Sequence, residues 1–218
     1  MLIFEHVTGK LKKGKKGTFV LQDISFHLEE GYLCGLIGKN GAGKSTLFRT
    51  ILNEDAQYAG RILYRGKDIK ECHSAFLSEV AYVADDNPFF MQKSVAQNVD
   101  LLGQFYPCWQ KDYFYQLMKR FEVPTRRQLC EMSRGEFIKF QIAFGMGHHA
   151  RLYLMDEATA GMDPVFRVDF YNILRELLKD GDCSVLMSTQ LQTDLNRNMD
   201  YIAKMDNGRM ISFMENDV

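Results

Sequence analysis

One short segment near the N-terminus constrains the fold of this chain more than any other. Residues 38–45 read Gly-Lys-Asn-Gly-Ala-Gly-Lys-Ser and fit the pattern G-x-x-x-x-G-K-[ST]. An apolar, strand-like run, Leu33–Ile37, precedes this segment, and a helical pattern, Lys44–Leu52, follows it. Glycines let successive backbone N–H groups curl around phosphate oxygens, and the helix N-terminus adds partial positive charge. The strand, turn and helix therefore predict a nucleotide phosphate site.

The same motif predicts which residues contact the nucleotide and its metal ion. Lys44 is expected to reach the β- and γ-phosphates, and the Ser45 hydroxyl is expected to bind Mg²⁺. The predicted nucleotide-binding residues of this segment are Gly38, Asn40, Gly41, Ala42, Gly43, Lys44, Ser45 and Thr46.

Two adjacent acids follow a second apolar strand, more than a hundred residues later. The run 152–155 is Leu-Tyr-Leu-Met and leads directly into Asp156 and Glu157. Asp156 is predicted to hold Mg²⁺, while Glu157 can activate a water molecule. The second acid favours hydrolysis of ATP over phosphoryl transfer to a bound metabolite, although a metabolite kinase remains an alternative.

Composition excludes several other classes of protein. The 218 residues include 27 Lys and Arg against 28 Asp and Glu, and 46% of them are hydrophobic. A disordered chain lacks that apolar content, and a nucleic-acid-binding chain usually carries a basic excess, so no nucleic acid partner is expected. No uncharged apolar run is long enough to span a bilayer, and Glu5 interrupts any signal-peptide core. We therefore expect a cytoplasmic protein.

The order of predicted elements indicates an α/β fold. Strands are expected at 2–6, 18–21, 24–28, 60–66 and 80–84, with a basic loop at 10–17, and strand–helix alternation resumes after residue 150. Between these parts, patterns at 94–106, 110–121 and 134–147 predict helices. The expected architecture is a single domain, 1–218. Its nucleotide-binding core has a mainly parallel sheet and an N-terminal antiparallel β-subdomain (1–86 and 150–218), and 87–149 form an inserted helical subdomain.

A second candidate anion site precedes the last of these helices. Ser133 is a favourable N-cap, and Glu136, three residues later, completes a capping box. Helix capping is by itself a sufficient reason for Ser133 and Glu136 to occur at this spacing. A helix N-terminus that carries Ser133 and Gly135 is also suited to bind a phosphate.

The motifs together resemble the nucleotide-binding domain of ATP-binding cassette (ABC) transporters, over essentially the whole chain. The residues that carry the resemblance are the phosphate loop, the acids Asp156 and Glu157, the segment 160–164 (Ala-Gly-Met-Asp-Pro) and the signature-like segment 133–136. This segment reads Ser133-Arg134-Gly135-Glu136, and Arg134 and Glu136 depart from the family's signature LSGGQ. The fold is then expected to be that of P-loop NTPases. The residues 105–109 (Phe-Tyr-Pro-Cys-Trp) are most similar to bacterial exporters of the ABC-2 type.

This resemblance implies the partners and the reaction. Two ATPase subunits, identical or different, are expected to pair so that Ser133 and Gly135 of one contact the ATP held by the other. Mg²⁺ is the expected cofactor, and an integral membrane permease is the expected partner. The segment around Pro88-Phe89-Phe90 and the helix that follows it are the expected dock for a cytoplasmic helix of this permease. The chain would then be peripheral at the inner face of the cell membrane.

Three departures from the family pattern bear on catalysis. Asp85 stands where the family has a glutamine, and near phosphate it is tolerated mainly as a Mg²⁺ ligand or when water separates the two groups. Gln190 replaces the family's histidine as a third catalytic residue beside Glu157 and Lys44. The adenine-stacking aromatic falls near Leu11, with Phe19 as a possible substitute. These changes predict slow basal ATPase activity, or a nucleotide sensor that hydrolyses ATP weakly.

Overall fold

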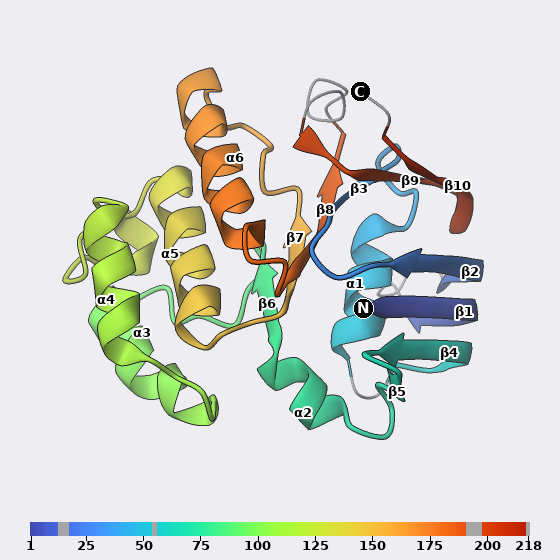
Figure 1. Ribbon diagram of the computed structural model, residues 1–218, viewed down its shortest axis with the longest axis horizontal. Helices are drawn as coiled ribbons and strands as arrows, with labels where there is room; N and C mark the ends of the chain where they lie inside the picture. Colours follow the sequence, from blue (N-terminus) through green and yellow to red (C-terminus); the bar gives the residue numbers. More distant parts are fainter. Residues whose placement is uncertain (13–17, 54–55, 191–197, 217–218) are drawn as a thin grey trace.

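The computed structural model describes residues 1–12, 18–53, 56–190 and 198–216, with side chains except at 10–12 and 18–20. Figure 1 shows two sheets on one side of the molecule and a layer of helices on the other. The strands are β1 (Leu2–Lys12), β2 (Thr18–Leu28), β3 (Leu33–Ile37), β4 (Tyr58–Tyr64), β5 (Lys67–Asp68), β6 (Val80–Val83), β7 (Leu152–Asp156), β8 (Ser184–Thr189), β9 (Tyr201–Asp206) and β10 (Arg209–Glu215). The α-helices are α1 (Lys44–Leu52), α2 (His73–Ser78), α3 (Val95–Leu102), α4 (Lys111–Arg120), α5 (Arg134–Gly147) and α6 (Pro164–Leu178).

The central sheet confirms the prediction of a mainly parallel core. Its order is β10-β9-β3-β8-β7-β6, and every neighbouring pair is parallel except β9 and β10. The carboxyl ends of β3, β6, β7 and β8 therefore meet at one edge of the sheet. In open α/β sheets, ligands bind at this edge.

The second sheet is antiparallel, as predicted, with the order β2-β1-β4-β5. Two details differ from expectation. Residues 10–12 continue β1 instead of forming a loop, whereas 13–17 lie outside the described residues. The two strands expected at 18–21 and 24–28 form the single strand β2, because a β-bulge with Asp23 in the left-handed region (φ 51°) absorbs the irregularity.

Alternating side chains of the central sheet build two cores. One face, with Leu36, Leu154 and Leu186, packs on α1 and on the antiparallel sheet. The opposite face, with Tyr153 and Val185, packs on α5 and α6. Strands buried on both faces explain the near-continuous apolar runs in the sequence.

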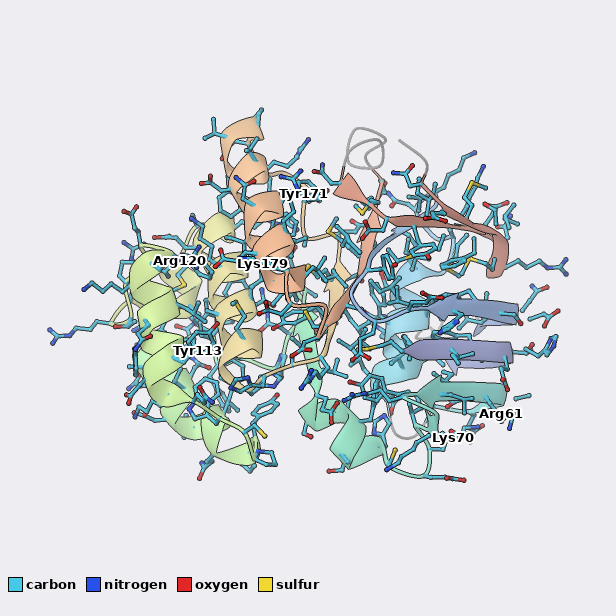
Figure 2. All side chains as sticks on the ribbon, in the orientation of Figure 1. Arg61, Lys70, Tyr113, Arg120, Tyr171 and Lys179 are labelled. Carbon is cyan, nitrogen blue, oxygen red and sulfur yellow. The ribbon has the colours of Figure 1, made fainter. Side chains whose placement is uncertain are left out.

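The three helical segments predicted before residue 150 are confirmed as α3, α4 and α5. A third core, rich in phenylalanine, joins them. The helix expected over 94–106 ends earlier, at Leu102, and a 3₁₀ turn follows, Gly103–Phe105. Trp109 packs so closely on Gly103 that a side chain at this position would collide with the ring. Figure 2 labels Arg120 on α4, whose guanidinium pairs with Glu176 and so ties α4 to α6.

Three elements were not predicted from the sequence: α2, β5 and β10. The β9–β10 hairpin turns at Asn207 (φ 45°) and Gly208 (φ 80°), and an Asn-Gly pair between two strands is a recognisable hairpin signal. Among the described helices, none has both the length and the apolarity to cross a bilayer.

Candidate functional site

The segment 38–45 forms a tight loop between β3 and α1. Gly41 (φ 83°) and Gly43 (φ 112°) adopt left-handed conformations. A Cβ at Gly38 would lie 2.5 Å from the Met205 carbonyl oxygen, so the loop can run this close to β9 only with glycine at this position. The Gly208 N–H donates to the Ala42 carbonyl oxygen at 2.8 Å and fixes the loop to the β9–β10 turn.

Lys44 opens α1 and is almost fully buried. Its ammonium donates hydrogen bonds to the carbonyl oxygens of Gly38 (2.7 Å) and Lys39 (3.3 Å). Nζ also lies 3.9 Å from Oε1 of Glu157. Burial lowers the pKa of Lys44, and the carboxylates of Glu157 and Asp156 oppose that shift. The side chain therefore folds back over its own loop, with its charge held beside the acids that follow β7.

The two acids are held by a serine that the sequence analysis missed. Ser188 stands opposite Asp156 in the pairing of β7 with β8, and its hydroxyl donates to Asp156 Oδ1 at 2.6 Å. The same hydroxyl accepts the N–H of Glu157 at 2.9 Å. A polar residue at the carboxyl end of an otherwise apolar buried strand was the available signal. Gln190, one residue beyond β8, donates from Nε2 to Glu157 Oε1 at 2.6 Å.

The oxygen donors here fit Mg²⁺ bound together with a nucleotide. Among the described residues no group of three or more His, Cys, Asp and Glu side chains could hold a metal alone. Magnesium, however, usually takes only one or two carboxylates from the protein, and substrate phosphates and water complete its shell. Ser45 at the start of α1 and Asp156 at the end of β7 offer a hydroxyl and a carboxylate, and Asp156 is oriented by Ser188.

The capping box predicted before α5 is confirmed. Ser133 Oγ accepts the N–H of Glu136 at 3.2 Å, and Glu136 Oε2 accepts the N–H of Ser133 at 2.8 Å. Burial alone raises the pKa of Glu136, but the hydrogen bonds from Ser133 and the Arg127 guanidinium outweigh it, so the pKa is lowered. Glu136 is therefore an anchored structural carboxylate.

A pocket of about 410 Å³ opens beside this capped helix start. Its lining includes Ser133, Gly135 and Lys139 from the α5 side, and Gly161 and Asp163 from the loop before α6. No residue of 38–46 lines it. The structure thus places Ser133 and Gly135 apart from the phosphate loop, at a second, separate opening.

Asp85 lies just beyond β6, where it forms an ion pair with Arg134 (3.2 Å). Arg134 Nη2 also donates to the backbone carbonyl of Glu157 at 3.2 Å. A Mg²⁺ ligand role for Asp85 would require this ion pair to open. Leu11 and Phe19 are cross-strand partners in β1 and β2, and their side chains lie outside the described part of the structure.

Comparison with known proteins shows the family to which the chain belongs. Residues 21–160 match the family described as ABC transporter. The ABC transporter ATP-binding protein YtrB of Bacillus subtilis (strain 168) is 32% identical over 210 residues, which are 95% of this chain and 71% of YtrB. The lipopolysaccharide export system ATP-binding protein LptB of Escherichia coli (strain K12) is 29% identical over 82% of this chain and 77% of LptB. Other relatives are named for methionine import or for Nod factor export.

Solved structures agree on the fold. The dimeric post-hydrolysis structure of the ATP-binding cassette MJ0796, bound to ADP and Pi, has a TM-score of 0.84 and 16% identity, and covers 100% of both chains. The family match spans well over half of the chain, and the phosphate loop and paired acids lie within it or at its edge. The chain therefore belongs to the ABC transporter family, as an ATP-binding and ATP-hydrolysing subunit.

Proposed function

We propose that two ATPase subunits of this kind pair around two ATP molecules and so power a membrane transporter. One observation supports the proposal: the predicted nucleotide-binding residues of one chain lie in two separate places. The phosphate loop and the acids meet at one edge of the sheet, whereas Ser133 and Gly135 line a separate pocket that contains no phosphate-loop residue. Head-to-tail pairing about a two-fold axis supplies each nucleotide with both halves.

Each residue at the sheet edge has a proposed role. Lys44 binds the β- and γ-phosphates, while Ser45 and Asp156 hold Mg²⁺, which neutralises charge on the phosphates when bound. Glu157 accepts a proton from water as the water oxygen attacks the γ-phosphorus and the bond to the bridging oxygen breaks. Gln190 holds the Glu157 carboxylate through its 2.6 Å hydrogen bond. Release of phosphate removes the contacts that keep the two subunits together.

The test is the oligomeric state of a variant that binds ATP without hydrolysing it. Glu157→Gln is expected to elute as a dimer on gel filtration with saturating Mg-ATP and as a monomer without it. The matched control is Glu157→Gln with Lys44→Met, which loses nucleotide binding and should stay monomeric under both conditions. A monomer of Glu157→Gln at saturating Mg-ATP contradicts the proposal.

A nucleotide sensor is the second candidate, because Asp85 and Gln190 replace the family's glutamine and histidine. Single-turnover hydrolysis in the assembled transporter separates the two functions. A transport motor releases phosphate once per bound ATP within the transport cycle, whereas a sensor retains intact ATP.

We further propose that a cytoplasmic segment of a membrane permease docks on an apolar groove. A pocket of about 350 Å³ lies between α2, β6 and α5, and Leu77, Pro88 and Phe89 line it together with Phe144. Two buried polar atoms in its lining, Gln141 Nε2 and His148 Nδ1, have no hydrogen-bond partner among the described residues. Both atoms are fully enclosed, so the proposed dock rests on the apolar lining of the groove.

Co-purification with the permease tests this dock. Leu77→Glu places a charge in the groove and should reduce recovery of the permease while leaving ATP-dependent pairing of the ATPase intact. Ile211→Glu makes the same kind of change on the exposed face of β10 and serves as the matched control. Equal recovery with both variants contradicts the proposed dock.

Through this permease the chain would lie at the inner face of the cell membrane. Export is the proposed direction, supported by the resemblance of residues 105–109 to exporters and by the relative named for lipopolysaccharide export. Cells without the chain should then accumulate the transported compound, whereas loss of an importer would deplete it.

A further inference from the structure

The backbone of Glu157 is held on both sides by side chains from other parts of the chain. Glu157 has a φ of 51°, in the left-handed region that non-glycine residues rarely adopt. Its N–H donates to Ser188 Oγ at 2.9 Å, and its carbonyl oxygen accepts from Arg134 Nη2 at 3.2 Å. Uncommon backbone conformations persist where the surroundings hold them, and they are frequent at functional sites. The orientation of the Glu157 carboxylate therefore depends on these two backbone contacts.

Arg134 is itself anchored by Asp85. The Arg134 guanidinium lies 3.2 Å from Asp85 Oδ2, and the two side chains are 37% and 69% exposed. A pair this exposed adds little to stability, and it places the guanidinium between the Asp85 carboxylate and the Glu157 carbonyl. Both residues are departures from the family pattern, one in the signature-like segment and one after β6. The structure shows that the two departures contact each other.

The three residues come from three separate elements. Asp85 follows β6, Arg134 is the first residue of α5, and Glu157 follows β7. In the pairing of subunits proposed above, Ser133 and Gly135 face the nucleotide on the partner copy's phosphate loop. Glu157, in contrast, serves the nucleotide of its own chain. Arg134 thus connects the segment that contacts one ATP with the residue that activates water for the other.

We propose that Arg134 is a positioning residue that couples the two ATP sites of the paired subunits, with Asp85 holding its guanidinium against the Glu157 carbonyl. The inference rests on the proposed function, because it needs a signature segment that faces the partner's nucleotide. Engagement of that nucleotide by Ser133 and Gly135 moves the start of α5, and Arg134 passes this displacement to Glu157. Coupling of this kind appears as cooperativity between the sites.

The test is steady-state ATP hydrolysis as a function of ATP concentration. Arg134→Gln should lower kcat by roughly 10- to 100-fold, the scale expected when a reacting group is slightly misplaced. KM should change less than about twofold, and the Hill coefficient should fall towards 1. Asp85→Asn should also lower kcat, but by a smaller factor. The double variant, Arg134→Gln with Asp85→Asn, should hydrolyse ATP no more slowly than Arg134→Gln alone, because the two residues act as one unit.

Arg61→Gln is the matched control, since it breaks an exposed Arg–Glu ion pair between β4 and β1, in the antiparallel sheet. It should leave kcat and the Hill coefficient unchanged. Unaltered kcat in Arg134→Gln, or effects of Arg134→Gln and Asp85→Asn that multiply independently, would overturn the inference. A fall in thermal stability with unchanged kcat would do the same.

Gel filtration separates this inference from the proposed function. Arg134→Gln combined with Glu157→Gln should still form the ATP-dependent dimer. If Glu157→Gln alone fails to dimerise, the proposed function itself is wrong. If both dimerise and Arg134→Gln hydrolyses ATP like the wild type, only the coupling role of Arg134 is overturned.

Discussion

Gln190 donates a hydrogen bond from Nε2 to Oε1 of Glu157 at 2.6 Å, and this carboxylate oxygen also lies 3.9 Å from the buried ammonium of Lys44. The two contacts join the end of β8, the end of β7 and the start of α1. An amide at position 190 can orient the carboxylate, but it cannot carry the positive charge that a histidine can. The geometry of the acid is therefore preserved while one electrostatic contribution is missing.

Replacing Gln190 by histidine should raise kcat. A protonated imidazole donates a hydrogen bond and adds positive charge near the γ-phosphate, and one well-placed donor is typically worth about 10²- to 10³-fold in rate. We expect Gln190→His to gain several-fold in steady-state phosphate release, and Gln190→Ala to lose about 100-fold. A lower or unchanged kcat in Gln190→His would refute this account of slow hydrolysis.

Lys44→Met should abolish stabilisation by nucleotide without unfolding the protein. At an ATP concentration of 100 times Kd, ligand binding stabilises a folded protein by about 2.7 kcal/mol. For a chain of this size, that corresponds to a rise in melting temperature of roughly 5–10 °C. Differential scanning fluorimetry with Mg-ATP should show the rise in the wild type only. A comparable rise in Lys44→Met would show that Lys44 does not bind the phosphates.

The stability of the protein should fall in mild acid because of His148. Burial lowers the pKa of His148 from 6.5 to about 4, against the opposing effect of a hydrogen bond to the backbone of Ser78. Between pH 6.5 and 4, the unfolded chain binds a proton that the folded chain does not. The contribution of His148 is therefore fully present above pH 6.5 and is lost as the pH falls towards 4, by about 3 kcal/mol.

Urea unfolding at a series of pH values measures this loss. His148→Phe keeps an aromatic ring beside Tyr106 but cannot titrate, so its free energy of unfolding should fall less over the same range. His149→Asn removes the neighbouring, exposed imidazole, and asparagine tolerates the left-handed backbone there (φ 58°). The His149 charge is the smallest of the effects that lower the pKa of His148, so this control should still lose stability towards pH 4. Identical profiles for wild type and His148→Phe would contradict the prediction.

Gly145→Ala should destabilise the protein although alanine favours helices. A Cβ at Gly145 would lie 2.6 Å from the Ala81 Cβ and 2.8 Å from Cε1 of Tyr153, where α5 packs on β6 and β7. Overpacking costs about 1–3 kcal/mol, which exceeds the helix-propensity gain of about 1 kcal/mol. Chemical denaturation should show the net loss, and adding Ala81→Gly should restore part of it. Increased stability of Gly145→Ala would mean that the helix and sheet are less tightly packed.

Features that depend on neighbouring residues could be predicted from the sequence. The phosphate loop was located because a strand, a glycine turn and a helix start follow one another within twenty residues. The boundaries of α1, Lys44–Leu52, and the capping box of Ser133 with Glu136 were correct for the same reason. The alternation of strands and helices also fixed the mainly parallel core. Short elements with few residues, such as α2 and β5, gave too weak a pattern to detect.

Contacts between distant residues were decided only by the tertiary structure. The sequence presents Asp85, Arg134 and Gln190 as three independent departures from a family pattern. Parallel pairing of β6, β7 and β8 brings their carboxyl ends to one edge, and the packing of α5 adds Arg134 there. Asp85 then pairs with Arg134, and both Arg134 and Gln190 bind Glu157. Which of these side chains contact each other depends on how whole helices and strands pack. The spacing of residues along the chain does not determine these contacts.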